Sequence, residues 1–162
     1  MIVKHPIEPF YNKNSRILIL GSFPSVKSRE QMFFYGHTQN RFWSVISSIF
    51  GAKAPENIEE KKNLLLFNNI ALWDVIASCD IVGSSDSSIK NVVANDLSII
   101  LSNAKIEKII VNGKTAEKYY NMYIKNRINK EAICLPSTSP ANATYSLEKL
   151  INEWKVAFES KI

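Results

Sequence analysis

The sequence predicts an α/β protein with three layers, an αβα arrangement in which helices cover both faces of a central, mainly parallel four-stranded sheet. Four short apolar runs have the composition of buried strands, and segments with helical spacing of apolar residues separate them. Strands that alternate with helices favour parallel pairing through right-handed crossovers. A chain of 162 residues suits one hydrophobic core, so we expect residues 1–162 to form a single domain.

The first half of the chain contributes two strands and two helices. An apolar run at residues 16–20 predicts a strand buried on both faces, and a glycine ends it. Apolar side chains recur at helical spacing over residues 41–50, which places Asn40 at or next to a helix N-terminus. A second helix is expected at residues 55–67, and the apolar run at 70–76 predicts the second strand.

The second half repeats the alternation. Residues 95–102 predict a helix, 108–113 the third strand, 115–124 a helix and 132–135 the fourth strand. The final helix is expected at residues 146–158. This helix is expected to bury Leu147, Leu150, Ile151, Trp154 and Phe158.

Net charge and apolar patterning restrict the partners and the compartment. The formal net charge of +5 and the sequence pI of about 9.2 favour a polyanionic partner. No apolar run reaches the roughly 18 residues that a membrane span needs. Residues 1–6 lack the apolar core of a signal peptide. We therefore expect a cytoplasmic protein without membrane contact, and a monomer.

Cysteine and histidine are too sparse for the usual metal sites. Cys79 and Cys134 lie far apart, which excludes a four-cysteine iron–sulfur cluster and a zinc site built from cysteines. We expect both to be buried, reduced thiols. His5 and His37 are the only histidines, so a histidine-based metal site is not expected, and neither is a cofactor.

Residues 35–43 concentrate aromatic, amide, imidazole and guanidinium groups without an aliphatic spacer. Aromatic rings suit stacking on a planar ligand, and amides suit hydrogen bonds to its edge or to a water molecule. Three polar loops, at residues 21–25, 74–88 and 136–142, each follow a predicted strand. Turn formation alone explains any one of them, but in a parallel sheet all three converge on one edge, where ligands bind. The sequence therefore predicts a cleft formed by these four segments.

These segments carry a resemblance that spans roughly residues 15–158. The motifs, in chain order, are Gly-Ser-Phe-Pro-Ser at 21–25, Tyr-Gly-His-Thr-Gln-Asn-Arg-Phe-Trp at 35–43, Ala-Leu-Trp-Asp-Val-Ile at 71–76, Val-Asn-Gly-Lys-Thr-Ala at 111–116 and Leu-Pro-Ser-Thr-Ser-Pro-Ala-Asn at 135–142. Together they resemble the uracil-DNA glycosylase superfamily, and most closely its sixth family, the hypoxanthine (deoxyinosine) DNA glycosylases. The resemblance implies a base-excision enzyme with this fold.

The chain departs from the wider superfamily at two motifs. The loop after the first strand usually carries an Asp or Asn that handles the attacking water, whereas this loop offers only Ser22 and Ser25. The last loop presents Ser137 and Thr138 where a histidine is common. The sixth-family pattern supplies its catalytic asparagine from the Gln-Asn-Arg-Phe-Trp segment, which corresponds to Asn40.

The resemblance implies roles for the remaining cleft residues. Asn40 positions the attacking water, and Ser22 contacts the base or the water. Tyr35 stacks on a flipped base, while Phe23 and Pro24 wall its other side. The residues expected to bind DNA are Ser25, Ser137, Ser139, Pro140, Ala141 and Asn142. The expected substrate is double-stranded DNA with a deaminated base. The enzyme is expected to hydrolyse only the glycosidic bond and to leave the DNA strand intact. Iron–sulfur branches of the superfamily are excluded by the cysteine count.

Other functions are compatible with parts of the sequence. Hypoxanthine and uracil present similar edges, so the preferred base, whether hypoxanthine, uracil or xanthine, stays open. A catalytically silent nucleic-acid-binding domain with this fold explains the missing Asp or Asn of the first loop, and a flavodoxin-like cofactor binder explains the alternation of strands and helices. A triad of Ser22 or Ser25 with His37 and Asp74 is disfavoured, because no glycines flank the serine as a nucleophile elbow requires.

Overall fold

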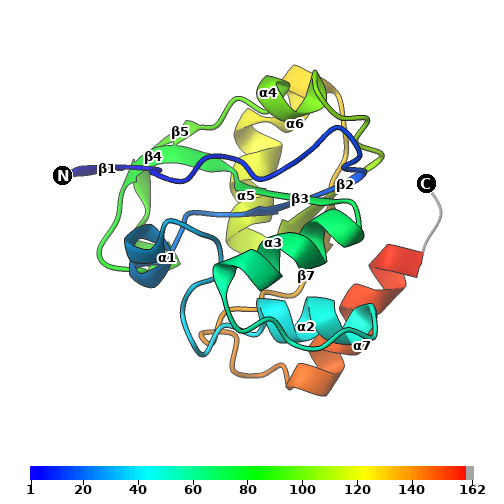
Figure 1. Ribbon diagram of the computed structural model, residues 1–162. Coiled ribbons are helices and arrows are strands. Elements are labelled where there is room, and N and C mark those ends of the chain that lie inside the picture. The colour runs from blue at the N-terminus through cyan, green and yellow to red at the C-terminus, as the bar shows by residue number, and fades with distance from the viewer. Residues whose placement is uncertain (160–162) are drawn as a thin grey trace.

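The computed structural model describes residues 1–159 and places a parallel four-stranded sheet at the centre of the molecule (Figure 1). The strands lie in the order β3-β2-β6-β7. Their bounds are β2 (Ile17–Gly21), β3 (Ile70–Asp74), β6 (Lys108–Asn112) and β7 (Ile133–Leu135). All three pairings are parallel, so the carboxyl ends of the strands meet at one edge. The four predicted strands and their mainly parallel arrangement are confirmed.

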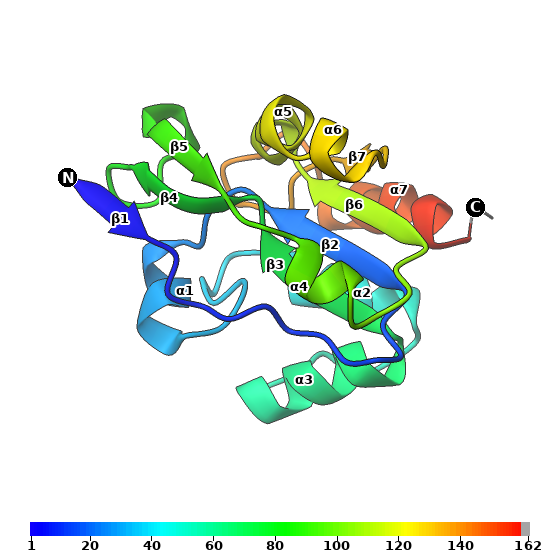
Figure 2. The ribbon, with the colours of Figure 1, turned by 90° about the horizontal axis from the view of Figure 1, so that it is seen from above.

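Helices cover both faces of this sheet. One face packs against α2 (Phe42–Ile49), α3 (Ile58–Phe67) and α7 (Leu147–Glu159). The opposite face packs against α5 (Lys114–Tyr123) and the short α4 (Ser98–Leu101). In Figure 2, α5 lies above the strands and α3 lies below them. The three-layer prediction is therefore confirmed.

Alternate residues of the central strands supply the two cores. Leu18 and Leu20 of β2 face the core under α5, and Ile19 between them faces the core under α2 and α7. All three are completely buried, as expected for a strand covered on both sides. On the α2 side, the fully buried rings of Phe42 and Trp154 meet edge to face at 6.0 Å between centroids. This contact fixes α2 against α7.

A second, smaller antiparallel sheet corrects the predicted loop at residues 74–88. Its strands are β1 (Ile2–Lys4), β4 (Ile76–Asp80) and β5 (Lys90–Ala94), in the order β1-β4-β5. Within this polar segment, Ile76 and Cys79 of β4 are fully buried, and the other three positions of the strand are half-buried. Only the remainder is loop and turn, including a short 3-10 helix at Asp86–Ser88.

Several further predictions need correction. The helix expected at 95–102 is confined to the four residues of α4. Two short helices, α1 (Val26–Gln31) and α6 (Lys125–Ile128), were not predicted. Leu147 is 41% exposed because it lies on the first turn of α7, whereas Leu150 and Trp154 are buried as predicted. Cys79 is buried and Cys134 is only half-buried, and both are free thiols.

The ends of the other elements follow the prediction within a few residues, and α2 begins at Phe42, immediately after Arg41. Among the helices of residues 1–159, none has the length and apolar character needed to cross a membrane.

Trp154→Ala should lower the free energy of unfolding by about 3–5 kcal/mol, because it leaves a cavity between α7 and α2. Equilibrium unfolding in urea measures the loss. Phe67→Ala at the end of α3 is the control, since Phe67 is 88% exposed and its truncation should change stability by less than about 0.5 kcal/mol. Similar losses from both substitutions would contradict this packing.

Candidate active site

A pocket of about 910 Å³ opens at the carboxyl edge of the central sheet. Parts of all four regions predicted to converge line it. These are all of 21–25 and 136–142, positions 35, 37 and 40 of the 35–43 segment, and positions 74 and 84–87 of the 74–88 segment. The lining contains every residue predicted to contact base, water or DNA, namely Ser22, Phe23, Pro24, Ser25, Tyr35, Asn40, Ser137, Ser139, Pro140, Ala141 and Asn142. Segments distant in sequence therefore share one cavity.

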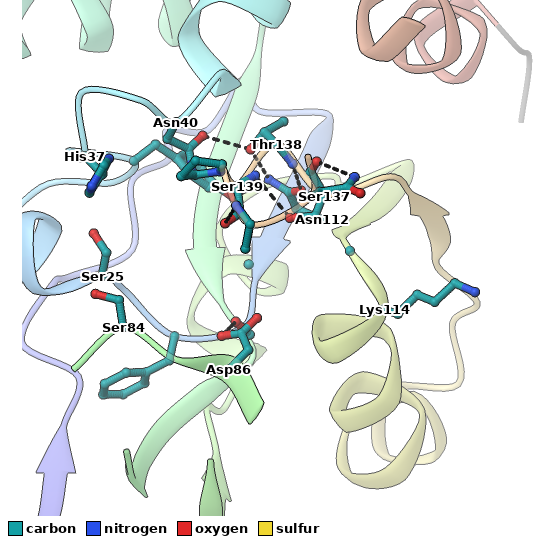
Figure 3. A pocket seen from close by; sticks show the side chains of 18 of the residues that line it. Ser25, His37, Asn40, Ser84, Asp86, Asn112, Lys114, Ser137, Thr138 and Ser139 are labelled. Carbon is teal, nitrogen blue, oxygen red and sulfur yellow. Dashed lines mark hydrogen bonds between the residues drawn. The ribbon is translucent and has the colours of Figure 1, made fainter. Parts of the chain in front are cut away.

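A chain of hydrogen bonds crosses one wall of the pocket (Figure 3). Asn112, at the end of β6, donates from Nδ2 to Tyr35 Oη at 3.2 Å and to Thr138 Oγ1 at 3.0 Å. The Thr138 hydroxyl donates to Asn40 Oδ1 at 2.9 Å. The backbone N–H of Phe42 donates to the same Asn40 oxygen, also at 2.9 Å. The chain joins residues 35–42, strand β6 and the 136–142 loop.

Backbone groups fix the direction of this chain. The N–H of Thr138 donates to Asn112 Oδ1 at 3.1 Å, so the Asn112 nitrogen must face Tyr35 and the Thr138 hydroxyl. The Thr138 hydroxyl then has its hydrogen left for Asn40 Oδ1, which already accepts from the Phe42 N–H. Among the described residues, none accepts from Asn40 Nδ2. Asn40 therefore presents a hydrogen-bond donor to the pocket.

Tyr35 is held between this chain and the core. Its ring stacks on Phe42 at 4.0 Å between centroids and 15° between planes, so Phe42 covers one of its two faces. Burial, followed by the negative charge of Asp74, raises the pKa of Tyr35 well above its usual value, and the bond from Asn112 opposes the shift. The phenol stays protonated. Phe42 and Trp43 are buried, as predicted for core residues.

Arg41 holds the 136–142 loop in place by donating hydrogen bonds to backbone carbonyls. Its backbone N–H donates to the Thr138 carbonyl at 3.0 Å, and its Nη2 donates to the carbonyls of Ser139 and Asn142 at 2.9 and 3.0 Å. Its Nη1 donates to the carbonyl of Tyr145. Arg41 was predicted only as part of a motif, and the structure gives it a bracing function for the loop.

The 136–142 loop uses most of its backbone N–H groups internally. The N–H of Ser139 donates to Ser137 Oγ at 3.1 Å, and the N–H of Ala141 donates to Ser139 Oγ at 3.2 Å. Asn142 donates its N–H to the carbonyl of Ser139. The two serine hydroxyls accept in these bonds and keep their own hydrogens to donate. Pro140 and Ala141 are exposed at the tip.

The 21–25 loop is tied to the segment around Asp86. Ser22 Oγ donates to Asp86 Oδ1 at 3.0 Å, so the hydroxyl predicted to contact base or water already has an acceptor. Burial of the carboxyl group raises the pKa of Asp86, the bond from Ser22 opposes this, and the charge of Asp74 adds to it. Phe23 is buried with the Arg29 guanidinium 5.5 Å from its ring centroid, and Ser25 caps α1.

Asp74 forms a buried pair with His5, a residue that no sequence motif singles out. His5 Nε2 and Asp74 Oδ2 lie 2.7 Å apart, with 3% and 6% of the two side chains exposed. The N–H of Ile7 donates to His5 Nδ1 at 3.2 Å, so the imidazole proton is on Nε2 and is donated to Asp74. The Ser-His-Asp triad is not assembled, because His37 accepts from the Gln39 N–H instead.

Four residues that line the pocket, Asn112, Thr138, Asp86 and Asp74, had no predicted role in base, water or DNA contact, and neither did His5, the partner of Asp74. Asn112 and Asp74 end strands, which is a detectable signal. His5 offers none, because 69 positions separate it from Asp74. Within residues 1–159, no group of three or more His, Cys, Asp or Glu side chains is placed to hold a metal ion.

Comparison with known proteins assigns this architecture to a family. The family model of the uracil DNA glycosylase superfamily matches residues 8–160. The chain belongs to the uracil DNA glycosylase superfamily. This membership makes it a DNA glycosylase, with DNA as its substrate, and confirms the predicted resemblance.

Two relatives and one solved structure match this glycosylase over nearly its whole length. It is 33% identical to the hypoxanthine DNA glycosylase of Methanosarcina acetivorans, covering 97% of this chain and 99% of the relative. It is also 33% identical to the hypoxanthine DNA glycosylase of Methanosarcina barkeri, with coverages of 96% and 98%. The solution NMR structure of a candidate uracil DNA glycosylase from Methanosarcina acetivorans superposes with a TM-score of 0.82 at 33% identity, covering 98% of this chain and 97% of that one.

Thr138→Val should lower the free energy of unfolding by about 1–3 kcal/mol, because it removes the hydroxyl that links Asn112 to Asn40 and leaves a buried amide hydrogen unpaired. Thr138→Ser keeps the hydroxyl and serves as the control. Urea unfolding of both variants makes the comparison. If the serine variant lost as much stability as the valine variant, the hydroxyl would not be the stabilising group.

Proposed function

We propose that this glycosylase excises hypoxanthine from double-stranded DNA that contains deoxyinosine, by hydrolysing the N-glycosidic bond. The observation that carries the proposal is the hydrogen-bond chain that fixes Asn40 Nδ2 as a donor in the pocket. Two relatives named hypoxanthine DNA glycosylase, which match nearly the full chain, support the same substrate.

The chemistry explains why a fixed donor is useful. When the glycosidic bond breaks, its electron pair leaves with the base and the sugar becomes positively charged. A donor that is already oriented toward the departing base stabilises its negative charge without reorganisation. Asn40 Oδ1 is occupied by two donors, so the amide has no acceptor with which to orient a water hydrogen. We therefore assign Asn40 to the base, in place of the water-positioning role predicted from the sequence.

The same donor favours hypoxanthine over adenine. Hypoxanthine carries a carbonyl oxygen where adenine carries an amino group, so an amide N–H finds an acceptor in the first base and another donor in the second. Leaving buried donors unpaired is the type of mismatch that discriminates strongly. A deaminated base is also mispaired, which lowers the free energy needed to flip it out of the duplex. Uracil and xanthine carry carbonyl acceptors as well and are the competing substrates.

Water is the proposed nucleophile, so the enzyme is monofunctional. Lys114 is the only lysine among the described residues that line the pocket. In Figure 3 its side chain extends away from Asn40 and Thr138. An amine nucleophile, which would lead to strand cleavage, is thus not placed beside the donor. On the DNA side, the free hydroxyl hydrogens of Ser137 and Ser139 suit phosphate contacts, and the exposed Pro140–Ala141 tip suits the space that a flipped base leaves.

Single-turnover excision from duplexes with one hypoxanthine, uracil, xanthine or adenine tests the function. We expect the fastest release from the hypoxanthine duplex and no release of adenine. The strand should stay intact until alkali or heat is applied. If no base is released, the protein is a catalytically silent DNA-binding domain and the proposal is wrong. If uracil is released faster than hypoxanthine, uracil is the preferred substrate. Strand breaks before alkali treatment would contradict the monofunctional mechanism.

Asn40→Ala should reduce single-turnover excision by about 100-fold or more, the usual consequence of losing one oriented donor. Asn40→Asp should be impaired at least as much, because a carboxylate cannot donate to the base. If Asn40 instead drew a proton from water, the aspartate would match or exceed the wild-type rate, which would contradict the assignment. Asn63→Ala and Asn63→Asp, on the exposed side of α3, are the controls and should retain the wild-type rate.

A further inference from the structure

The Asp74 carboxylate has one oxygen held by the protein and one without a donor among the described residues. Oδ2 accepts from His5 Nε2 at 2.7 Å. None of the described residues donates to Oδ1, and Asp74 lines the pocket. The side chain is 94% removed from solvent, its exposed fraction being 6%. An oriented carboxylate with a free oxygen therefore belongs to the lining of the pocket.

Gly21 leaves the space that this free oxygen occupies. Gly21 of β2 and Asp74 of β3 are partners in the parallel register of the sheet. A Cβ atom added at Gly21 would lie 2.4 Å from Asp74 Oδ1 and 3.2 Å from Tyr35 Oη. No side chain other than hydrogen fits unless the carboxylate moves. The loop that begins at Gly21 has no carboxylate of its own, and the neighbouring strand supplies one at the same place.

Asp74 is a negative charge without a cationic partner among the described residues. Its partner His5 is neutral, because the Ile7 N–H occupies Nδ1 and the single ring proton is on Nε2. Tyr35 and Asp86 are the other titratable groups that face it, and after burial its charge contributes to the raised pKa of both. Two further carboxylates line the pocket. Asp86 is bonded to Ser22, and Glu153 lies exposed on α7.

We propose that Asp74 is a catalytic residue of this glycosylase and that His5 is the residue that positions it. The inference rests on the proposed hydrolysis. The bond between the sugar C1′ and the base nitrogen breaks, and its electron pair leaves with the base, whose charge Asn40 meets. Asp74 stabilises the positive charge on the sugar. Water forms the new C1′–O bond, its proton passes to Asp74 Oδ1 and then to solvent, and the released base takes up a proton from solvent.

His5 acts through Asp74 and is held by the core. The Phe23 and Trp73 rings meet its imidazole edge to face, at 5.8 and 6.2 Å between centroids. Trp73 Nε1 in turn donates to the carbonyl of Ile7 at 3.1 Å, which fastens the segment that carries His5. With Nε2–H bound to Oδ2, rotation of the carboxylate is restricted and Oδ1 stays beside Gly21 in the pocket lining.

Asp74→Asn tests the carboxylate while keeping its shape and its bond to His5. We expect single-turnover excision to fall by about 100-fold or more, within the range for a lost general base, with little change in duplex affinity. Gly21→Ala should produce a similar loss without altering any charge, because its methyl group displaces Oδ1. Asp96→Asn makes the same chemical change at an exposed aspartate outside the pocket and should retain the wild-type rate.

Duplexes that carry a sugar analogue and no base measure how strongly the Asp74 charge attracts a cationic sugar. Comparing two analogues on the same protein removes effects of folding and of base identity. The wild-type and Asp96→Asn proteins should bind a duplex with a protonated pyrrolidine at the abasic position at least about tenfold more tightly than one with neutral tetrahydrofuran. Asp74→Asn should abolish that preference. His5→Leu should lower both excision and the preference, and His5→Gln, which keeps an N–H donor, should restore most of each.

The outcomes separate the two proposals. A wild-type protein that releases no base refutes the proposed function and this inference with it. An active wild type whose Asp74→Asn variant stays within about threefold of its rate, or keeps the cation preference, overturns the inference alone. A larger loss from Asp86→Asn than from Asp74→Asn also overturns it. A His5→Leu variant that is less stable but keeps the preference removes the positioning role of His5.

Discussion

The pocket depends on the hydrogen bonds that run from Tyr35 through Asn112 and Thr138 to Asn40. Each link is about 3 Å long, and the backbone N–H groups of Thr138 and Phe42 set the direction of the whole chain. A backbone N–H can only donate, so neither amide can rotate without losing a bond. The same links hold three segments that are distant in sequence at the carboxyl edge of the sheet. These hydrogen bonds thus determine both the geometry of the cavity and the direction in which the Asn40 amide points.

The proposed chemistry places opposite demands on the two sides of the cavity. The departing base gains negative charge and needs a donor, which Asn40 Nδ2 offers. The sugar gains positive charge and needs an anion, which Asp74 offers. The Asp74 carboxylate occupies the space that a side chain at position 21 would fill. Both groups are oriented before any substrate binds, Asn40 by Thr138 and Asp74 by His5. Groups that need not reorganise during the reaction stabilise its transition state most effectively.

The sequence was sufficient for the central sheet and for the position of the pocket. Continuous apolar runs define buried parallel strands, and the loops after such strands must share an edge, so the convergence of residues 21–25, 74–88 and 136–142 followed from topology. The aromatic and amide composition of residues 35–43 indicated that this segment joins them. The small antiparallel sheet escaped prediction because β4 has only two fully buried positions, three residues apart, within a segment that resembles a loop. The partners of Asp74, Ser22 and Asn112 escaped it because side-chain bonds across the fold leave no periodic signal.

A crystal structure with a duplex containing a non-hydrolysable deoxyinosine, such as its 2′-fluoro analogue, would show directly whether Asn40 meets the base and Asp74 the sugar. We expect the flipped base to accept a hydrogen bond from Asn40 Nδ2, with Thr138 and the Phe42 N–H still bound to Oδ1, and we expect Asp74 Oδ1 to face C1′. A base held away from Asn40, or an Asn40 amide turned so that its oxygen faces the base or water, would contradict this expectation.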